Sequence, residues 1–118
     1  ARSKGTLPFM AIETLWGEKH LPRHDLQSFF YVLLWICWNY AGPNNAERQN
    51  IDLMENQAKH WICGDGLDFE NIGNAKAQQM TADRAVFRRS TLGMFAPYFE
   101  DLKDCVMKLR DKLFQDFG

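Results

Sequence analysis

The longest apolar run in the chain lies between residues 26 and 39, where almost every position is hydrophobic. A length of about fourteen residues favours a helix over a strand, and a helix that is apolar all round belongs in the middle of a core. Asp25 stands directly before this run, so its carboxylate is placed to cap the first helical turn. The pattern therefore predicts a central buried helix over residues 25–39.

A shorter helical pattern precedes the central run. Its apolar side chains recur at three- and four-residue spacing, at Phe9, Ile12, Leu15 and Trp16. Residues 17–24 are mostly polar and contain Pro22, which is typical of a loop. We therefore expect a short helix and then a loop, both within residues 1–24.

The stretch over residues 40–82 is predicted to be a connection with one or two helices. Turn-forming residues at 41–45 end the central helix. Apolar positions then follow a helical period, at Ile51, Met54, Ala58, Trp61 and Ile62. A further helix is expected from Asp68 to Met80, although Gly73 inside it lowers helix propensity by roughly 1 kcal/mol relative to Ala.

The last part of the chain, residues 83–118, has two helical patterns. Asp83 to Phe95 is a short amphipathic segment with a basic face, and Pro97 suits the first turn of the final helix. That helix has one apolar stripe, formed by Tyr98, Leu102, Val106, Leu109, Leu113 and Phe117. Because no segment alternates with the period of a strand, the chain is predicted to be all-α, as one helical domain over residues 1–118.

Composition and charge exclude several classes of protein. The 118 residues are 46% hydrophobic and 25% charged, which is typical of a globular domain. A net charge of −1 gives no general attraction to nucleic acid or to anionic lipid, and neither partner is expected. The apolar run over residues 29–38 is too short to span a membrane, which takes about twenty residues. Three dispersed cysteines favour a reducing, intracellular compartment, either cytoplasm or nucleus.

Two motifs near the N-terminus point to a family. Gly5-Thr6 is followed by Met10-Ala11-Ile12-Glu13, and Asp25-Leu26-Gln27-Ser28 opens the apolar run. This arrangement resembles the end of a protein-kinase activation segment leading into the central helix of the kinase C-terminal lobe. The form of the second motif is most like the fungal-type protein kinase family. Ile12, Gln27 and Phe30 replace the Pro, Trp and Gly of most kinases, and these replacements fit the fungal subgroup better.

The resemblance implies roles for three residues. Thr6 would be the substrate-loop threonine, whose hydroxyl contacts the catalytic aspartate. Glu13 would form a buried ion pair with an arginine further along the C-lobe. Asp25 would bind backbone amides of the catalytic loop. The arginine that pairs with Glu13 is left open among Arg84, Arg88, Arg89 and Arg110.

Phosphoryl transfer needs a Gly-rich loop, a strand Lys, a catalytic Asp and a metal-binding Asp. None of these motifs occurs in the 118 residues, so we expect no catalytic, cofactor-binding or metal-binding residue in this chain. ATP and Mg²⁺ are implied for a longer parent kinase, and this chain alone is expected to be inactive.

Two functions fit these observations. The first is the C-lobe portion of a Ser/Thr-type kinase, which provides substrate-loop and scaffold elements for a protein or peptide substrate. The second is a stand-alone helical binding module or pseudokinase remnant. Apolar surface left uncovered by an absent N-lobe would favour binding of that lobe, of a protein partner or of a second copy.

Overall fold

The computed structural model describes residues 7–44 and 69–115, and its regular elements in these ranges are all helices. In chain order they are η1 (Leu7–Phe9), α1 (Ile12–Leu15), α2 (Pro22–Asn39), α4 (Phe69–Met80), α5 (Arg84–Ser90), η3 (Leu92–Met94), η4 (Pro97–Leu102) and α6 (Lys103–Leu113), where η marks a 3-10 helix. This confirms the all-α prediction for the described part of the chain. The helix expected over residues 51–62 lies outside it. No helix within the described ranges has both the length and the apolar character that a membrane crossing requires.

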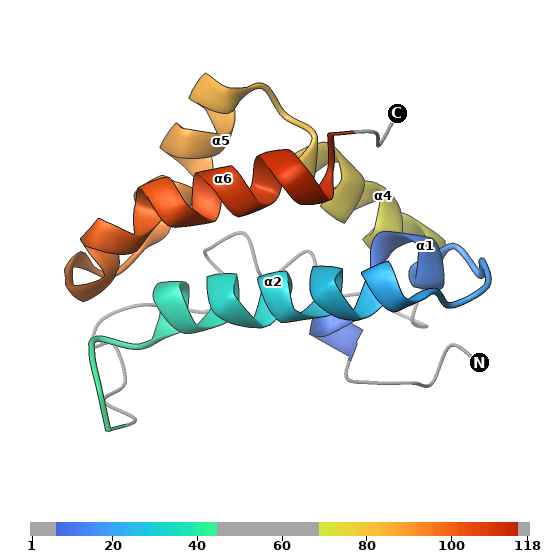
Figure 1. Ribbon diagram of the computed structural model, residues 1–118, viewed down its shortest axis with the longest axis horizontal. Coiled ribbons are helices and arrows are strands. Elements are labelled where there is room, and N and C mark those ends of the chain that lie inside the picture. The colour runs from blue at the N-terminus through green and yellow to red at the C-terminus, as the bar shows by residue number, and fades with distance from the viewer. Residues whose placement is uncertain (1–6, 45–68, 116–118) are drawn as a thin grey trace.

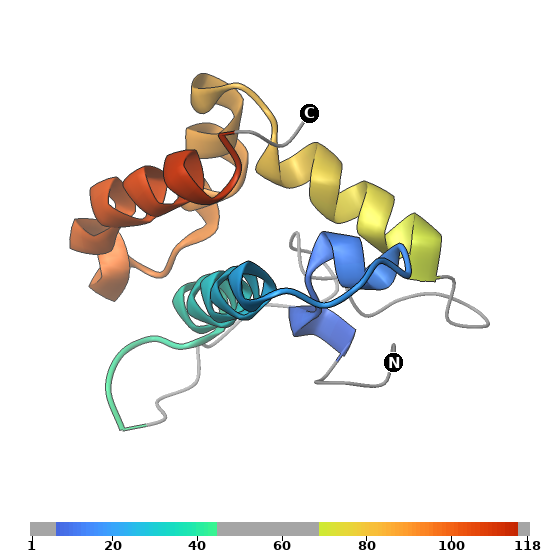
Figure 2. The same cartoon turned by 45° about the vertical axis from the view of Figure 1, so that its right-hand side comes forward.

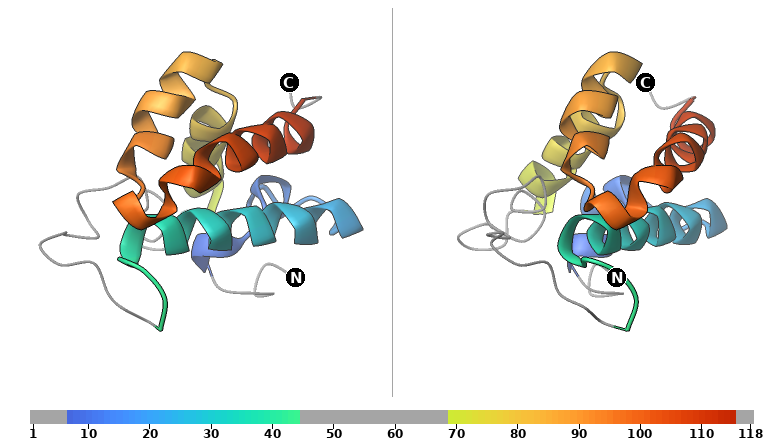
Figure 3. Two further views of the ribbon diagram at one scale, coloured as in Figure 1. Left: turned by 60° about the vertical axis from the view of Figure 1, so that its left-hand side comes forward. Right: turned by 90° about the vertical axis from the view of Figure 1, so that its left-hand side faces the viewer.

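The long helix α2 runs through the molecule, and the other helices are arranged around it (Figure 1). Helix α6 packs on α2 and runs in the opposite direction, as the views in Figures 1 and 3 both show. Helix α1 packs against α4 near the N-terminal end of α2 (Figure 2). The N-terminal segment, α2 and α4 therefore meet at one end of the molecule.

The main core is aromatic and joins α2 to the C-terminal helices. Phe30 of α2 and Phe114 at the end of α6 are in edge-to-face contact, with ring centroids 5.9 Å apart. Two hydrogen bonds tie the C-terminal half of α2 to the segment around η3. The Trp38 indole N–H donates to the Thr91 carbonyl at 2.9 Å, and the Ala96 N–H donates to the Cys37 carbonyl at 2.8 Å. Burial raises the pKa of the Cys37 thiol to about 11, so it stays protonated at neutral pH.

Helix α2 begins three residues earlier than expected. Pro22 occupies the first helical position, which suits its fixed φ and its missing N–H. The His24 ring closes this end, because its Nδ1 accepts a hydrogen bond from the Leu21 N–H at 2.9 Å. The cap residue is therefore Leu21, and the prediction that Asp25 caps the helix is wrong.

Burial of α2 is also less complete than its composition predicts. Leu26 is 61% exposed and Phe29 is 64% exposed, and both belong to the N-terminal half of the helix. Ile36, further along, is 37% exposed. One side of α2 thus packs in the core, while an apolar part of its surface remains open.

The glycine that weakened the expected helix over residues 68–80 has a packing role. A Cβ added at Gly73 would lie 2.7 Å from Nε1 of Trp16, closer than real Cβ contacts allow. The same indole N–H donates to Asn74 Oδ1 at 3.0 Å. Gly73 and Asn74 thus give Trp16 its place between α1 and α4, and helix α4 forms despite its low propensity there.

The final helix differs from its predicted stripe. Residues Pro97–Leu102 form η4 rather than the first turns of one α-helix, and Tyr98 is 60% exposed. The side chains that α6 buries are Val106, Met107 and Arg110. The predicted apolar stripe is therefore confirmed at Val106, Leu109 and Leu113, which lie in or against the core. It is wrong at Tyr98 and Leu102, which belong to the 3-10 helix and are exposed. Phe117 lies outside the described residues.

Candidate functional site

A buried polar network forms where α1 meets α2, and Gln27 lies at its centre. Its side-chain oxygen accepts a hydrogen bond from the Ile12 backbone N–H at 2.7 Å and another from the Tyr31 hydroxyl. Its amide nitrogen donates to Glu13 Oε1 at 3.0 Å. Gln27 therefore uses both ends of its side chain to fix the first turn of α1 against α2.

Glu13 and His24 form the inner edge of this network. Because Nδ1 of His24 accepts from Leu21, the neutral ring carries its proton on Nε2. That Nε2 lies 3.7 Å from Glu13 Oε1, beyond hydrogen-bond distance, and His24 is 1% exposed. Burial lowers the pKa of His24, and the nearby Glu13 carboxylate offsets part of this effect. His24 is thus held mainly as a neutral ring beside a carboxylate.

Helix α4 contributes a buried lysine on the other side of Tyr31. The Nζ atom of Lys76 donates to the Met10 carbonyl at 2.7 Å and lies 4.4 Å from the centroid of the Tyr31 ring. Burial lowers the pKa of Lys76 well below its usual range, and burial together with Glu13 raises the pKa of Tyr31. The network therefore joins the N-terminal segment to α2 and α4.

The structure treats the three residues named by the kinase resemblance differently. Glu13 is buried within the network, whereas Asp25 is exposed and its carboxylate lies 2.9 Å from the His20 ring. Thr6 lies outside the described residues. Glu13 and Asp25 are therefore not brought together, and of these two carboxylates Glu13 belongs to the network.

Among the described residues no arginine forms an ion pair with Glu13, in contrast to what the resemblance implies. Arg88 pairs with Asp104 at 3.3 Å, and Arg84 pairs with Asp111. Arg110 is buried, and its Nε donates to the Met80 carbonyl at the end of α4 at 3.0 Å. Glu13 instead relies on the Gln27 amide.

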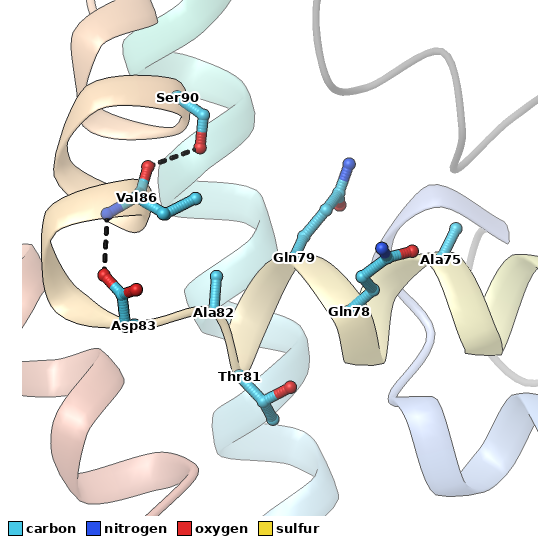
Figure 4. Close-up of a pocket in the computed structure, with 8 residues that line it drawn as sticks. All are labelled: Ala75, Gln78, Gln79, Thr81, Ala82, Asp83, Val86 and Ser90. Atoms are coloured by element: carbon cyan, nitrogen blue, oxygen red, sulfur yellow. Dashed lines mark hydrogen bonds between the residues drawn. The ribbon is translucent and has the colours of Figure 1, made fainter.

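A hollow of about 660 Å³ lies between α4 and α5 (Figure 4). Its lining is Ala75, Gln78, Gln79, Thr81, Ala82, Asp83, Val86 and Ser90. Asp83 accepts from the Val86 N–H, and the Ser90 hydroxyl donates to the Val86 carbonyl, so both serve α5 itself. Within the described ranges, no cluster of three His, Cys, Asp or Glu side chains could hold a metal ion.

Reasoning from the sequence missed the centre of the network. In the sequence, Gln27 stands out only as a departure from the usual Trp, and His24 belongs to a predicted loop. Lys76 and Tyr31 belong to no predicted site. A signal was present, because Gln27 and Tyr31 are polar groups four residues apart in an apolar helix. Polar groups in such a position need partners. Nothing in the local sequence indicates that the partner of Lys76 is a backbone carbonyl 66 residues away.

Comparison with known proteins supports the resemblance over the N-terminal part of the chain. A family model described as fungal protein kinase matches residues 1–37, which is under a third of the 118 residues. No curated protein and no solved structure matches the chain. The matched residues contain Glu13 and Gln27, and so include the contact between α1 and α2.

Proposed function

We propose that this chain is part of the C-terminal lobe of a fungal-type Ser/Thr protein kinase. In this proposal residues 1–24 end the activation segment, α2 is the central C-lobe helix, and the chain provides the substrate-loop scaffold. It does not transfer phosphate alone, because the sequence has none of the motifs that bind ATP and Mg²⁺. A longer intracellular parent would supply those groups.

The observation that carries this proposal is the attachment of the first turn of α1 to α2. Gln27 binds both the Ile12 N–H and the Glu13 carboxylate, and both partners lie within the matched residues 1–37. A kinase must hold its substrate loop still, since a displacement of about 1 Å at the reacting groups can cost about a hundredfold in rate. A backbone fixed at Ile12, six residues after Thr6, suits that task.

Two further residues have roles in the proposal. Thr6 is the substrate-loop threonine that contacts the catalytic aspartate of the parent. Asp25 lies in the first turn of α2 with its carboxylate exposed, so it is accessible to backbone amides of a catalytic loop. Charge-assisted hydrogen bonds of this kind are among the stronger ones. The partner of the assembled site is a protein or peptide substrate.

The native gene product tests the proposal. It is isolated from its source cells with an antibody to this segment, its intact mass is measured, and phosphate transfer from labelled ATP to Ser/Thr peptides is assayed. We expect a product of several hundred residues with kinase activity. Thr6→Val should abolish most of this activity, while Thr6→Ser should restore it because the hydroxyl returns. Thr81→Val, at an exposed position after α4, is the matched control and should leave activity unchanged.

A product of 118 residues that transfers no phosphate would contradict the kinase proposal. It would favour the second candidate function, a helical binding module. The observation that favours this alternative is the open apolar surface of α2, where Leu26 and Phe29 are each more than 60% exposed. Such a module should co-precipitate with a protein partner or with a second copy of itself, and Phe29→Ser should abolish that association.

A further inference from the structure

Lys76 is a fully buried charged residue placed where α4 meets the N-terminal segment. Lysine is almost never fully buried unless its amine is paired, because desolvation of an ammonium group costs free energy. The Lys76 amine donates to the Met10 carbonyl at 2.7 Å, and its Nζ lies 4.4 Å from the centroid of the Tyr31 ring. The Lys76 amine is therefore buried at the point where it binds the Met10 carbonyl.

That backbone group lies in the short link between η1 and α1. The Met10 carbonyl is held from α4 by Lys76, and the Ile12 N–H, two residues later, is held from α2 by Gln27. Met10 and Ile12 are themselves buried. Two fixed polar groups on one short segment, each bound by a different helix, define both its position and its direction.

Glu13 has no arginine partner among the described residues, so the segment is anchored by other means. We propose that Lys76 is a positioning residue that ties the end of the activation segment to α4 through the Met10 carbonyl. It thereby sets the place of the substrate loop that precedes this segment. Lys76 thus anchors this segment through Met10, whereas the kinase resemblance implies an anchor formed by an arginine and Glu13. This inference rests on the proposed kinase function.

The first test measures backbone hydrogen exchange in the native gene product. Lys76→Met keeps the length of the side chain and removes the donor, so peptides covering Met10–Trp16 should exchange about tenfold faster. Peptides from α6 should be unchanged. Lys76→Gln, which keeps an N–H donor on a shorter stem, should restore part of the protection. Lys108→Met changes an exposed lysine of α6 and is the matched control, with no effect expected in either region.

Two outcomes would overturn the role of Lys76. Exchange over Met10–Trp16 that is identical in Lys76→Met and wild type would show that the amine does not hold this segment. Equal loss of protection in Met10–Trp16 and in α6 would show that Lys76 serves the whole fold rather than one segment.

The second test separates the lysine's role from the proposed function. If the native product is a kinase, Lys76→Met should raise the KM for peptide about tenfold and leave the KM for ATP unchanged, because substrate placement alone is altered. An equal rise in both KM values would overturn the positioning role. A product without kinase activity, but with faster exchange in Lys76→Met, would refute the kinase proposal and keep Lys76 as the anchor of this segment.

Discussion

Two regions of the molecule join their helices by different means. Where α1, α2 and α4 meet, the contacts include buried polar groups centred on Gln27 and Lys76. Where α5 meets α6, Arg88 and Asp104 form an ion pair on the surface, with side chains 50% and 83% exposed. The first kind of contact fixes the position of particular backbone atoms, and the second leaves both partners in water.

The difference follows from the cost of burying a polar group. A buried donor or acceptor that loses its partner costs about 1–3 kcal/mol, whereas an exposed ion pair contributes about 0–1 kcal/mol. Any other arrangement of the N-terminal segment would therefore leave buried polar groups around Gln27 without partners and would be less stable. Phe87 of α5 and Val106 of α6 are both buried in the main core, and Arg110 of α6 lies over the Phe87 ring. We expect substitutions of polar residues to affect the two regions unequally.

The largest expected effect is that of Gln27→Leu. Leucine fills a similar volume but leaves the Ile12 N–H, the Tyr31 hydroxyl and the Glu13 carboxylate without their shared partner. The free energy of unfolding should fall by about 3 kcal/mol, as measured by urea denaturation. Gln78→Leu, on the exposed side of α4, is the matched control and should change it by about 0.5 kcal/mol or less. Equal effects of the two substitutions would contradict the central place of Gln27.

The sequence predicts the helices here better than it predicts the network. Helices α2 and α4 were expected close to their observed bounds, because their apolar periods and flanking turn residues are local signals. The predicted beginning of α2 is three residues late, because proline is typical of loops as well as of the first helical position. The exposure of Leu26 and Phe29 could not be foreseen, because every candidate face of that helix is apolar.

The candidate site was predicted only at Glu13. Its expected arginine partner came from family resemblance, and the structure places Gln27 there instead. Lys76 is distant in sequence and binds a carbonyl, which no side-chain motif encodes. Buried polar contacts of this kind depend on the three-dimensional arrangement of helices, so local patterns cannot locate them.

The next largest effect is expected at Gly73, where α4 packs against α1. Ala at position 73 would gain helix propensity but place its Cβ 2.7 Å from the Trp16 indole, so the ring must shift and lose its bond to Asn74. Gly73→Ala should therefore lower the free energy of unfolding by about 1–2 kcal/mol. Thermal unfolding measures this as a lower melting temperature. Gly93→Ala is the control, because its Cβ would meet its nearest atom at 3.6 Å. It should be neutral or slightly stabilising. A Gly73→Ala protein as stable as wild type would show that Trp16 adapts freely.

Sensitivity to acid should also distinguish the two regions. Burial lowers the pKa of His24 below 6.5, so as the pH falls through that value the unfolded chain binds a proton that the folded chain does not. The neutral ring therefore contributes its full stability above pH 6.5. As the pH falls from 6.5 to the lowered pKa of the folded state, the free energy of unfolding decreases by at most about 1.4 kcal/mol per pH unit. Lys76 also makes the free energy of unfolding decrease as the pH falls, but at higher pH, because its lowered pKa lies below that of an unfolded lysine.

Urea denaturation between pH 7 and pH 5 measures the contribution of His24. His24→Asn keeps an acceptor near the Leu21 N–H and removes the titrating ring, so its unfolding free energy should depend less on pH in this range. A His24→Asn slope equal to that of wild type would mean that the ring is protonated equally in both states.

The smallest effect is expected at the surface ion pair between α5 and α6. Arg88→Met should lower the unfolding free energy by less than about 0.5 kcal/mol, because both charges are largely solvated and salt screens them. A double-mutant cycle with Asp104→Asn isolates the pair, and its coupling energy should vanish in 1 M salt. A coupling energy above about 1 kcal/mol would mean that this ion pair holds α5 to α6 as strongly as the buried network holds α1 to α2. In that case the two regions would differ in exposure without differing in how strongly polar contacts hold them.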